Sequence, residues 1–359
     1  MKSVCFQSVG VVATIDLPDA EIQNPSDAIV RTTLAGLCGS DLHPFWGRET
    51  GLVPGTVMGH EMVGIVETVG DAVDPTIAKV GDRVFIPFST NCGDCFYCRS
   101  GLTSRCEVGQ LFGWRNESSA SNQQNGSRIE GLHGCQSEFV RIPLANATLK
   151  RLPESISDEE GLLLGDNFST GYFCAQMAGI KPEGVYAVVG CGTVGQLCIV
   201  AAKSMGAQQI IAVDPVPERR KRAEALGAIA VDPDNAVAET KSRTDARGVD
   251  AVMELVGATA AQELAFELIR PGGTMSVVGC HCSPHFAFSP IGAYDKNLTY
   301  KTGRCPARHY MDILTDQVAA GKFDLSGFIN REFSFAESEQ AYDVFSNRKD
   351  GCLKAVFRP

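Results

Sequence analysis

Two different patterns of hydrophobic and polar positions divide the chain. Between about residues 180 and 280, short apolar runs alternate with longer segments whose apolar residues recur at helical spacing. The short runs predict buried strands at 185–190, 209–214, 249–257 and 274–279. The longer segments predict helices at 193–206, 217–227 and 259–270, the last stopped by Pro271-Gly272-Gly273. Strands and helices that alternate at this spacing predict an α/β domain with a doubly wound parallel sheet.

The rest of the chain lacks this alternation. In the first 150 residues, β-rich runs are separated by turns of Gly, Pro and Asp, which predicts an irregular, mostly β domain. The last 55 or so residues predict helices at 311–322 and 336–349 and a strand at 352–359, and we expect them to return to the first domain. The polar segment 115–130 predicts an inserted surface loop, which either shields a pocket or only covers surface.

Composition excludes several classes of function. Hydrophobic residues make up 44% of the chain and charged residues 21%, as in ordinary globular proteins. The net charge of −10 argues against a nucleic-acid partner, and the basic run 219–222 is interpreted as a solvated helix face. The sequence contains no run of about 20 apolar residues, so it predicts no membrane span, and the N-terminus lacks the pattern of a signal peptide. The 14 cysteines predict metal ligation and buried thiols in the cytoplasm rather than a secreted disulfide framework.

A dinucleotide-binding motif lies at the start of the predicted parallel sheet. Gly190, Gly192 and Gly195 follow a strand and open a helix, and Asp214 ends the next strand. The glycines permit a tight turn and bring a pyrophosphate close to the helix N-terminus, whose N–H groups attract negative charge. A carboxylate at position 214 favours the ribose of NAD over the 2′-phosphate of NADP, unless Arg219 and Arg220 compensate. The alternative is an acidic residue that only ends a strand.

Two groups of residues are candidate metal ligands. Four thiolates with the spacing C-x2-C-x2-C-x7-C predict a closed tetrahedral zinc site that does no chemistry, at Cys92, Cys95, Cys98 and Cys106. The alternative is a loop with four unligated thiols. The second group is Cys38 and His60, and residues so far apart predict little by themselves, because a core cysteine and a hydrogen-bonded histidine explain them equally well.

Taken together, the motifs resemble those of one family. GLCGSDLH, MGHEMVGIVETVG, KVGDRV, the four-cysteine loop and VVGCGTVG occur in the order found in the zinc-containing medium-chain dehydrogenase/reductases, the alcohol dehydrogenase family. The resemblance covers essentially the whole chain. It implies a GroES-like irregular β-barrel catalytic domain at 1–167 and 305–359, with a structural zinc loop at 92–106, and a Rossmann dinucleotide-binding domain at 168–304. It also implies an NAD-dependent alcohol dehydrogenase with one catalytic and one structural zinc per chain.

The resemblance implies a set of ligands for the catalytic zinc. These are Cys38, His60 and Asp166, the last of which precedes a threonine-glycine-aromatic segment. Many family members have cysteine where Asp166 stands, so the sequence resembles the branch that uses aspartate, which includes formaldehyde and secondary alcohol dehydrogenases. Glu61 is expected near the metal as a neighbour or a transient ligand, and Asp41 is expected to orient His60.

The resemblance also implies a path for the substrate proton and a set of cofactor contacts. Zinc lowers the pKa of the alcohol, Ser40 takes the proton, and the nicotinamide ribose passes it to His43 at the surface. The alternative is that His43 is a surface histidine with no part in proton transfer. Thr170 is expected to pack on the nicotinamide. The residues expected to bind the cofactor are Gly190, Gly192, Thr193, Val194, Gly195, Asp214, Arg219, Val278, Gly279 and Lys354.

One position departs from the family pattern, and the substrate stays open. Where many members have Arg or His after the ligand cysteine, this chain has Gly39, so one positive contact to the cofactor is missing. An apolar pocket is expected to bind a small unbranched or aromatic alcohol or aldehyde, and its lining would be Trp46, Phe112, Trp114 and Phe168, each of which fits core packing equally well.

Several activities are alternatives to the oxidation of a simple alcohol. Within the family, these are formaldehyde oxidation or dismutation and the oxidation of polyols or threonine, and they stay open. Outside it, a zinc-free reductase of quinones or enones and a redox sensor built on the cysteine loop both conflict with the intact ligand motifs. The resemblance further implies a dimer or a tetramer.

Overall fold

The computed structural model describes residues 1–116 and 131–359, which form two compact units. The first unit contains residues 1–166 and 306–359, and the second contains residues 167–305. Each boundary lies one residue from the domain boundary expected above. Most of the polar loop predicted at 115–130 lies outside the described residues.

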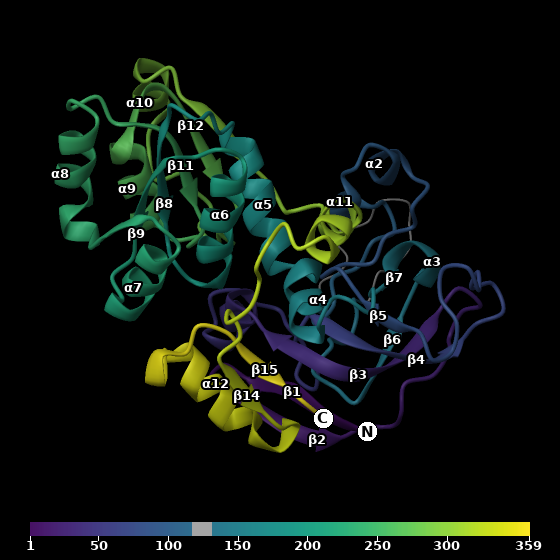
Figure 1. The fold of residues 1–359 in the computed structure, drawn as a ribbon. Coiled ribbons are helices and arrows are strands. Elements are labelled where there is room, and N and C mark those ends of the chain that lie inside the picture. The colour runs from purple at the N-terminus through teal and green to yellow at the C-terminus, as the bar shows by residue number, and fades with distance from the viewer. Residues whose placement is uncertain (117–130) are drawn as a thin grey trace. The chain divides into compact units, whose positions relative to one another are not determined.

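A seven-stranded sheet organises the first unit (Figure 1). Six of its strands pair in the order β14-β15-β3-β4-β5-β7, and β6 also pairs with β3. All neighbours are antiparallel except β14 and β15, and a hairpin of β1 and β2 stands apart from this sheet. The strands are β1 (Lys2–Ser8), β2 (Val11–Asp16), β3 (Ala28–Leu37), β4 (Met62–Val69), β5 (Arg83–Phe85), β6 (Phe139–Ile142), β7 (Lys150–Arg151), β14 (Arg331–Phe333) and β15 (Ala355–Phe357).

The end of the chain returns to this sheet, since β15 pairs with β3. The predicted helices at 311–322 and 336–349 correspond to α11 and α12, although both are shifted or shortened at their ends. Side chains from the hairpin, β3, β15 and α12 share one hydrophobic core, which buries the C-terminal segment against the N-terminal one. The helices of this unit are α1 (Leu42–Phe45), α2 (Phe96–Arg99), α3 (Ala145–Thr148), α4 (Asp158–Gly165), α11 (Ala307–Ala319) and α12 (Ser338–Ser346).

The second unit is a doubly wound parallel sheet, which confirms the fold class predicted from the alternating pattern. Its six strands are all parallel and lie in the order β10-β9-β8-β11-β12-β13, so the chain reverses direction across the sheet between β8 and β11. The strands are β8 (Val185–Val189), β9 (Gln209–Val213), β10 (Ile229–Val231), β11 (Val249–Glu254), β12 (Ile269–Val277) and β13 (Thr299–Thr302).

Helices cover both faces of this sheet (Figure 1). One face is covered by α5, α6 and α7, and the other by α8 and α9. These helices and the short α10 are α5 (Asn167–Ala178), α6 (Thr193–Ser204), α7 (Pro217–Ala225), α8 (Pro233–Arg243), α9 (Thr259–Leu268) and α10 (Pro290–Asp295). Strands covered on both sides are typically apolar, and β8 shows this with five buried residues in succession.

One predicted boundary in this unit is wrong. The sequence predicted a helix through Arg270 that Pro271-Gly272-Gly273 would stop, but α9 ends at Leu268 and these residues lie inside β12. Ile269 pairs with Val249 of β11, and the register shifts before the regular pairing resumes at Thr274. The strand pairing of Ile269 therefore ends the helix before the proline does, and the Pro-Gly-Gly segment forms an irregularity in the strand.

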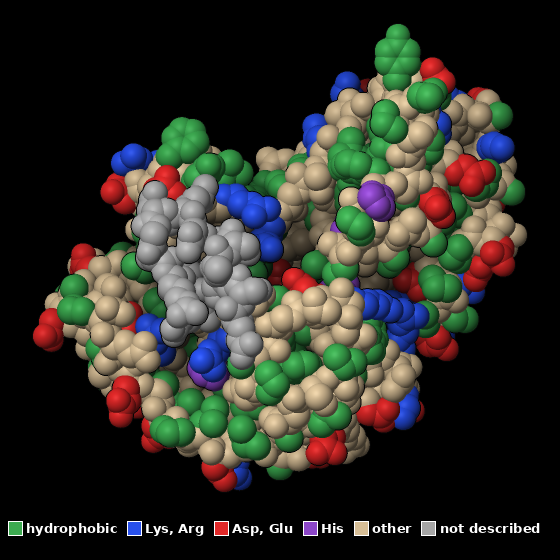
Figure 2. Space-filling view, turned by 180° about the vertical axis from the view of Figure 1, so that it is seen from behind, with side chains coloured by type: hydrophobic (Ala, Val, Ile, Leu, Met, Phe, Trp, Pro, Cys, Tyr) green, Lys and Arg blue, Asp and Glu red, His purple; other side chains and the backbone are tan. Residues whose placement is uncertain are grey.

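Within the described residues, no helix is both long and apolar enough to cross a bilayer. Figure 2 shows acidic and basic side chains interspersed over the face that it presents. Many of the charged groups form ion pairs with neighbouring side chains, as Arg31 does with Glu67 and Lys150 with Asp312. The expected absence of a nucleic-acid partner stays a prediction.

Candidate metal and cofactor sites

Strand pairing in the first unit brings the dispersed candidate ligands together. Cys38 follows β3, His60 and Glu61 precede β4, and these two strands pair antiparallel. The Gly36 N–H donates to Glu61 O at 3.0 Å, so the pairing continues up to the candidate ligands. Asp166 caps the C-terminal end of α4, which packs against both strands. Antiparallel strands and one helix end thus converge from distant parts of the sequence.

Four side chains with metal-ligating atoms meet at this point. The ligand atoms of Cys38, His60, Glu61 and Asp166 all lie within 4.8 Å of one another. Asp166 Oδ2 lies 3.7 Å from Cys38 Sγ and 3.6 Å from His60 Nε2. A zinc ion bound to S, N and O donors at about 2.0–2.3 Å needs ligand atoms about this far apart, so the cluster fits zinc.

Asp41 holds two of these residues from behind. Its Oδ1 lies 3.0 Å from His60 Nδ1, and its Oδ2 accepts the Cys38 N–H at 2.9 Å. With Nδ1 turned to a carboxylate, Nε2 is the His60 nitrogen that faces the cluster. Burial lowers the pKa of His60, but the charge of Asp41 and hydrogen bonds outweigh it and raise the pKa well above its usual value.

Asp166 is charged in spite of its burial. Burial alone would raise its pKa, but the hydrogen bond and the charge of His60 prevail and lower the pKa to about 2. The pKa of the buried Cys38 thiol shifts in the opposite direction from that of Asp166. Desolvation and the charges of Glu61 and Asp166 raise it. A cation is therefore the partner that this group of donors needs in order to hold Cys38 as a thiolate.

Glu61 and Lys354 form a buried ion pair that sequence reasoning missed. Their side chains are almost fully buried, and Lys354 Nζ contacts Glu61 Oε2. Burial raises the pKa of Glu61, although the charge of Lys354 opposes the rise. A side chain at Gly36 would overlap Glu61, so a glycine there leaves room for the pair. The partners are 293 residues apart in the sequence, so no local sequence pattern predicts their contact.

The four-cysteine loop forms the second cluster. The sulfur atoms of Cys92, Cys95, Cys98 and Cys106 lie within 4.8 Å of one another, and four sulfurs at about 2.3 Å from a zinc ion would be about 3.8 Å apart. Backbone N–H groups point at these sulfurs: the N–H of Cys95 donates to Cys92 Sγ at 3.3 Å, and the N–H of Cys92 donates to Cys106 Sγ at 3.2 Å. Such donors stabilise thiolates, so this cluster also fits zinc.

Of the two residues of the predicted proton path, Ser40 lies beside the first cluster. Ser40 Oγ donates to Cys38 Sγ at 3.3 Å and lies 3.3 Å from His60 Nε2. The expectation that His43 is at the surface is wrong, because its side chain is buried at 8% exposure on the short helix α1. This helix packs its residues into the first unit directly after the ligand loop, which draws His43 inward.

The glycine motif has the geometry expected of a phosphate-binding turn. It connects β8 to α6, and Gly192 is the residue that caps the helix. A side chain at Gly195 would overlap Gly190 O, so only glycine permits this close approach of helix and strand. At Gly192, in contrast, an added Cβ would meet nothing nearer than Arg219 Nη1 at 3.7 Å. The space above Gly192 is therefore available to a ligand. Thr193 and Val194 form the first turn of α6.

Asp214 lies at the carboxyl end of β9 and is fixed in place. Its Oδ2 accepts the Cys191 N–H at 2.8 Å and its Oδ1 accepts the Val216 N–H at 2.8 Å. Arg219 Nη1 lies 3.8 Å from the same carboxylate. Arg220 is occupied elsewhere, since its Nη1 donates to Asp214 O at 2.7 Å and to Asp232 Oδ2 at 2.9 Å. Both arginines therefore lie beside the motif, but Arg220 is also held by Asp232.

The remaining predicted cofactor residues are distributed over both units. Thr170 lies in the first turn of α5, and Val278 and Gly279 follow β12 at the carboxyl edge of the parallel sheet. The N–H groups of Val278 and Gly279 donate to Glu254 O at 3.1 and 3.2 Å. Lys354 belongs to the first unit and is engaged by Glu61. Its contact with a pyrophosphate stays a prediction.

Two of the aromatic residues expected in a substrate pocket pack in the interior. Phe112 belongs to a hydrophobic core with residues of β3, β4 and β5. Phe168 is fully buried and makes an edge-on contact with Tyr172 at 6.2 Å between ring centroids. Trp114 packs partly buried against the other core, while Trp46 is more exposed, with Arg48 stacked over its ring. Core packing is thus the better interpretation for Phe112 and Phe168.

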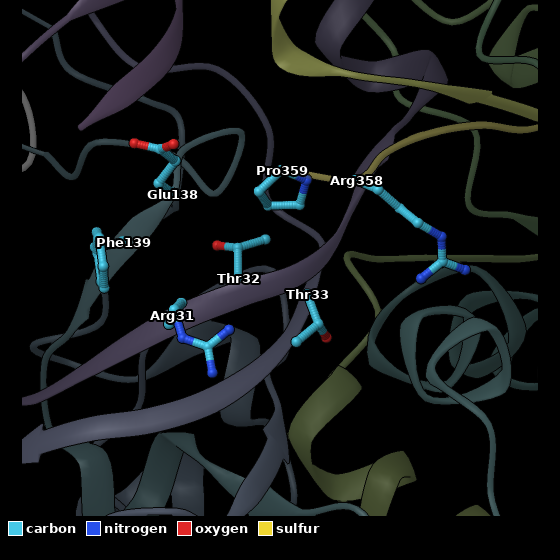
Figure 3. Close-up of a pocket in the computed structure, with 7 residues that line it drawn as sticks. All are labelled: Arg31, Thr32, Thr33, Glu138, Phe139, Arg358 and Pro359. Atoms are coloured by element: carbon cyan, nitrogen blue, oxygen red, sulfur yellow. The ribbon is translucent and has the colours of Figure 1, made fainter.

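A cavity of about 420 Å³ in the first unit contains none of the predicted site residues (Figure 3). Its two arginines already have carboxylate partners, Arg31 with Glu67 and Arg358 with Glu159. Neither of the two metal-ligating clusters found among the described residues contributes to its lining. The cavity is lined by Arg31, Thr32, Thr33, Glu138, Phe139, Arg358 and Pro359.

Comparisons with known proteins agree with this geometry. Residues 24–154 match the alcohol dehydrogenase GroES-like domain, and residues 193–314 match the zinc-binding dehydrogenase domain. The whole chain is 36% identical to zinc-type alcohol dehydrogenase B of Aspergillus flavus, of which it covers 81%. It is 32% identical over both full lengths to an uncharacterized zinc-type alcohol dehydrogenase-like protein of Bacillus subtilis.

Solved structures give the same result. The alcohol dehydrogenase TADH from Thermus sp. ATN1 superimposes over all of both chains with a TM-score of 0.91 and 35% identity. The 2R,3R-butanediol dehydrogenase from Bacillus subtilis superimposes with a TM-score of 0.81 and 25% identity, over 100% of this chain and 99% of the other. The mostly antiparallel first unit is therefore the GroES-like domain predicted from the sequence, and the parallel sheet is the Rossmann-like domain.

Proposed function

Because the chain belongs to the zinc-dependent alcohol dehydrogenases of the medium-chain dehydrogenase/reductase family, we propose that it oxidises a small alcohol, or reduces the matching aldehyde or ketone, with NAD as hydride carrier. The observation that supports this most is the convergence of Cys38, His60, Glu61 and Asp166 within 4.8 Å. Family membership makes the chain an oxidoreductase. The cofactor, the ligands and the substrate are the proposed part.

Three side chains would hold the catalytic zinc: Cys38, His60 and Asp166. Together they offer a sulfur, a nitrogen and an oxygen donor and leave a fourth position for substrate, as catalytic zinc sites do. The metal, when bound, supplies a Lewis acid that lowers the pKa of the substrate hydroxyl. With aspartate in place of a second thiolate, this donor set would place the chain in the aspartate branch of the family. Glu61 is held by Lys354 at the edge of the cluster, which suits a neighbour or transient ligand.

The proton of the alcohol would leave through Ser40. Its hydroxyl lies 3.3 Å from both Cys38 Sγ and His60 Nε2, at the rim of the cluster where a substrate hydroxyl would be held. We place His43 as the base farther along the path, because it lies three residues beyond Ser40 and an imidazole exchanges protons near neutral pH. The burial of His43 delays exchange with bulk water unless a bound ligand connects them.

The second unit would hold NAD at the carboxyl edge of its parallel sheet. The glycine turn would accept the pyrophosphate at the N-terminus of α6, and Asp214 would accept the ribose hydroxyls. NADP is disfavoured, because Asp214 is a buried carboxylate and Arg220 is occupied by Asp232. NAD, when bound, supplies the hydride acceptor.

The test begins with metal content and cofactor reduction. We expect two zinc ions per chain and formation of NADH, followed by its absorbance, with at least one member of a panel of alcohols, polyols, threonine and the formaldehyde–glutathione adduct. NADP should be reduced far more slowly. Asp166→Ala should lose about one zinc per chain and activity by about a hundredfold or more, because a ligand contributes directly to metal affinity. Retention of both metals in this variant would refute the ligand assignment.

A polyol is the second candidate substrate. The chain is 28% identical to the sorbitol dehydrogenase of Bacillus subtilis over 97% of that protein, and the butanediol dehydrogenase shares its fold. The burial of Phe112 and Phe168 also removes two of the aromatic side chains expected to line an apolar pocket. Faster turnover of vicinal diols than of simple alcohols in the same panel would select this candidate.

We further propose that the protein is a cytoplasmic homo-oligomer. Its fourteen cysteines are all thiols rather than disulfides, which suits a reducing compartment. Three large apolar side chains of the second unit, Phe286, Ile291 and Tyr294, are strongly exposed, and Phe286 contacts Tyr300 of the sheet-edge strand β13. Exposed apolar groups of this kind favour association. Light scattering should give a mass of two or four chains, and a monomer would contradict the proposal.

A further inference from the structure

The cysteines divide sharply by exposure, and two of them have no role in the proposed function. Eight of the fourteen are buried, and the four of the zinc loop are half-buried. Cys280 and Cys282 are the exposed pair. Exposed thiols react with disulfides and metals, whereas buried ones are inert. This pair therefore calls for an explanation that zinc ligation and core packing do not give.

The segment with these two cysteines is anchored by the residue between them. His281 Nε2 lies 3.0 Å from Glu254 Oε2, and Gln262 Nε2 lies 2.8 Å from the same nitrogen. Glu254 is fully buried, and its Oε1 accepts the N–H groups of Val256 and Gly257 at 2.8 Å each. His281 is thus turned inward, while both of its cysteine neighbours are exposed. The two exposed cysteines therefore flank a residue that is anchored to a buried carboxylate.

This segment borders the proposed cofactor site within the second unit. A side chain on Gly257 would overlap the backbone of Cys280, and a side chain on Gly190 would overlap Val256. The glycine turn after β8, the turn after β11 and the cysteine segment after β12 therefore touch in a row at the carboxyl ends of neighbouring strands. Ligands of open parallel sheets bind along this edge, at the point where the strand order reverses.

We propose that Cys280 and Cys282 form a thiol-modification site that takes low-molecular-weight disulfides, such as oxidised glutathione, and that its modification blocks the cofactor edge. The blocking effect rests on the proposed function, since it requires NAD to bind along this edge. A glutathionyl group is bulky and carries carboxylates, so at Cys280 it would compete with the phosphates of a dinucleotide for space and for positive potential.

The chemistry needs only the disulfide itself. The Cys280 thiolate attacks one sulfur of the disulfide, the S–S bond of the small molecule breaks, and one thiol leaves with a proton. The product is a mixed disulfide at Cys280. The Cys282 thiolate then attacks the Cys280 sulfur and releases the second small thiol. Two cysteines are oxidised, one disulfide is reduced to two thiols, and a thiol reductant reverses both steps.

The test follows mass and cofactor binding in the same zinc-loaded protein. The protein is incubated with oxidised glutathione without oxygen, and its intact mass, zinc content and NADH affinity by fluorescence titration are measured. The wild type should end as a protein disulfide that lacks two hydrogens. Cys282→Ser should stop at one added glutathionyl group, and the double variant Cys280→Ser/Cys282→Ser should not change in mass. Zinc content should be the same throughout.

The glutathionylated Cys282→Ser protein should bind NADH about tenfold or more weakly than the unmodified variant, and a thiol reductant should restore the affinity. Because linkage is reciprocal, saturating NADH should lower the equilibrium constant for glutathionylation of Cys282→Ser by a similar factor. The double variant should bind NADH equally well with and without oxidised glutathione.

Three results would contradict this inference in different ways. Modification of the zinc-loop cysteines with loss of zinc, while Cys280 and Cys282 stay reduced, would overturn the site. Unchanged NADH affinity of fully glutathionylated Cys282→Ser would overturn the blocking effect. Protein that binds no NADH before oxidation would contradict the proposed function itself, and the blocking effect would fail with it. The mass readout then still decides whether the two cysteines form the modification site.

Discussion

Desolvation and the charges of two arginines set the charge state of His133. Its Nδ1 accepts the Val57 N–H at 3.1 Å, and Arg115 Nη1 lies 3.2 Å from its Nε2. Desolvation, followed by the charges of Arg115 and Arg141, lowers the pKa of His133 to about 4. The neutral imidazole is the form that can accept the Val57 N–H, so protonation breaks a contact between segments that are 76 residues apart.

This arrangement predicts the pH dependence of the contact. Since the folded pKa of His133 lies below its unfolded value of about 6.5, the unfolded chain binds more protons between about pH 6.5 and pH 4. The contribution of His133 to stability is therefore full above pH 6.5 and decreases as the pH falls towards 4. Proton NMR of the imidazole, assigned by comparison with His133→Asn, should show titration near pH 4. A midpoint near 6.5 would contradict the environment described.

Gly39 offers a residue-scale test of cofactor release. An added Cβ at this position would meet no atom within 4 Å, so a larger side chain can be introduced without disturbing the ligand loop. Gly39→Arg should supply a charge-assisted hydrogen bond to a cofactor phosphate, worth about 1.5–3 kcal/mol, and slow NADH release by about tenfold or more. Gly39→Gln is the neutral control of comparable length. Stopped-flow release rates that are equal for wild type and Gly39→Arg would remove the idea of a missing contact.

At the scale of elements, local sequence patterns predicted those parts of the candidate sites whose residues lie close together in the sequence. The cysteine loop spans fifteen residues and the glycine motif spans six, so spacing alone carries each of them. The ligands Cys38, His60 and Asp166 are brought together by the pairing of β3 with β4 and by the end of α4, and only resemblance predicted them. Pairings between distant elements leave no periodic trace in the sequence, which is why the Glu61–Lys354 pair was missed.

The end of α9 also shows that a local sequence pattern cannot predict the effect of pairing with a distant strand. Helical spacing and the Pro-Gly-Gly segment predicted a boundary at Arg270, yet Ile269 already pairs with Val249 of the neighbouring strand. Local propensity ranks where a helix can end, but the hydrogen bonds available from an adjacent strand decide where it does end. The parallel sheet itself was predictable because its covered strands are continuously apolar.

Two glycines of the same turn separate the folding role of the β8–α6 connection from its binding role. Gly195→Ala would place a methyl group against Gly190 O, where the backbone cannot yield easily, and should destabilise the protein by about 1–3 kcal/mol. Gly192→Ala would meet only Arg219 at 3.7 Å, so it should keep wild-type stability. Its methyl group would instead occupy the space proposed for the pyrophosphate and should weaken NADH binding by about tenfold.

Denaturant unfolding and NADH fluorescence titration measure the two effects on each variant. The decisive comparison is Gly192→Ala, because its binding loss cannot be attributed to misfolding when its unfolding midpoint matches that of the wild type. A Gly192→Ala protein that binds NADH as tightly as the wild type would place the dinucleotide elsewhere. A Gly195→Ala protein of normal stability would contradict the close helix–strand packing.

At the scale of the whole molecule, the two proposed ligand classes are separated between units. All eight residues of the two metal clusters belong to the unit of residues 1–166 and 306–359, whereas the glycine turn and Asp214 belong to residues 167–305. Each cluster also makes hydrogen bonds with residues of the same unit, as His60 does with Asp41 and Cys106 Sγ does with the Cys92 N–H. Loss of metal from one cluster should therefore leave the dinucleotide turn unaltered.

The cysteine loop provides the sharpest test of this separation. Cys95→Ser/Cys98→Ser removes two of its four sulfur donors, so the loop should lose its zinc and one metal per chain should remain. Because a closed zinc site contributes folding energy to the unit that holds it, the thermal unfolding midpoint should fall by about 5 °C or more. NADH affinity should stay within about twofold of the wild type, since the cofactor turn lies in the other unit. Loss of both zinc ions, or of NADH binding, from this variant would show that the clusters and the cofactor turn are coupled.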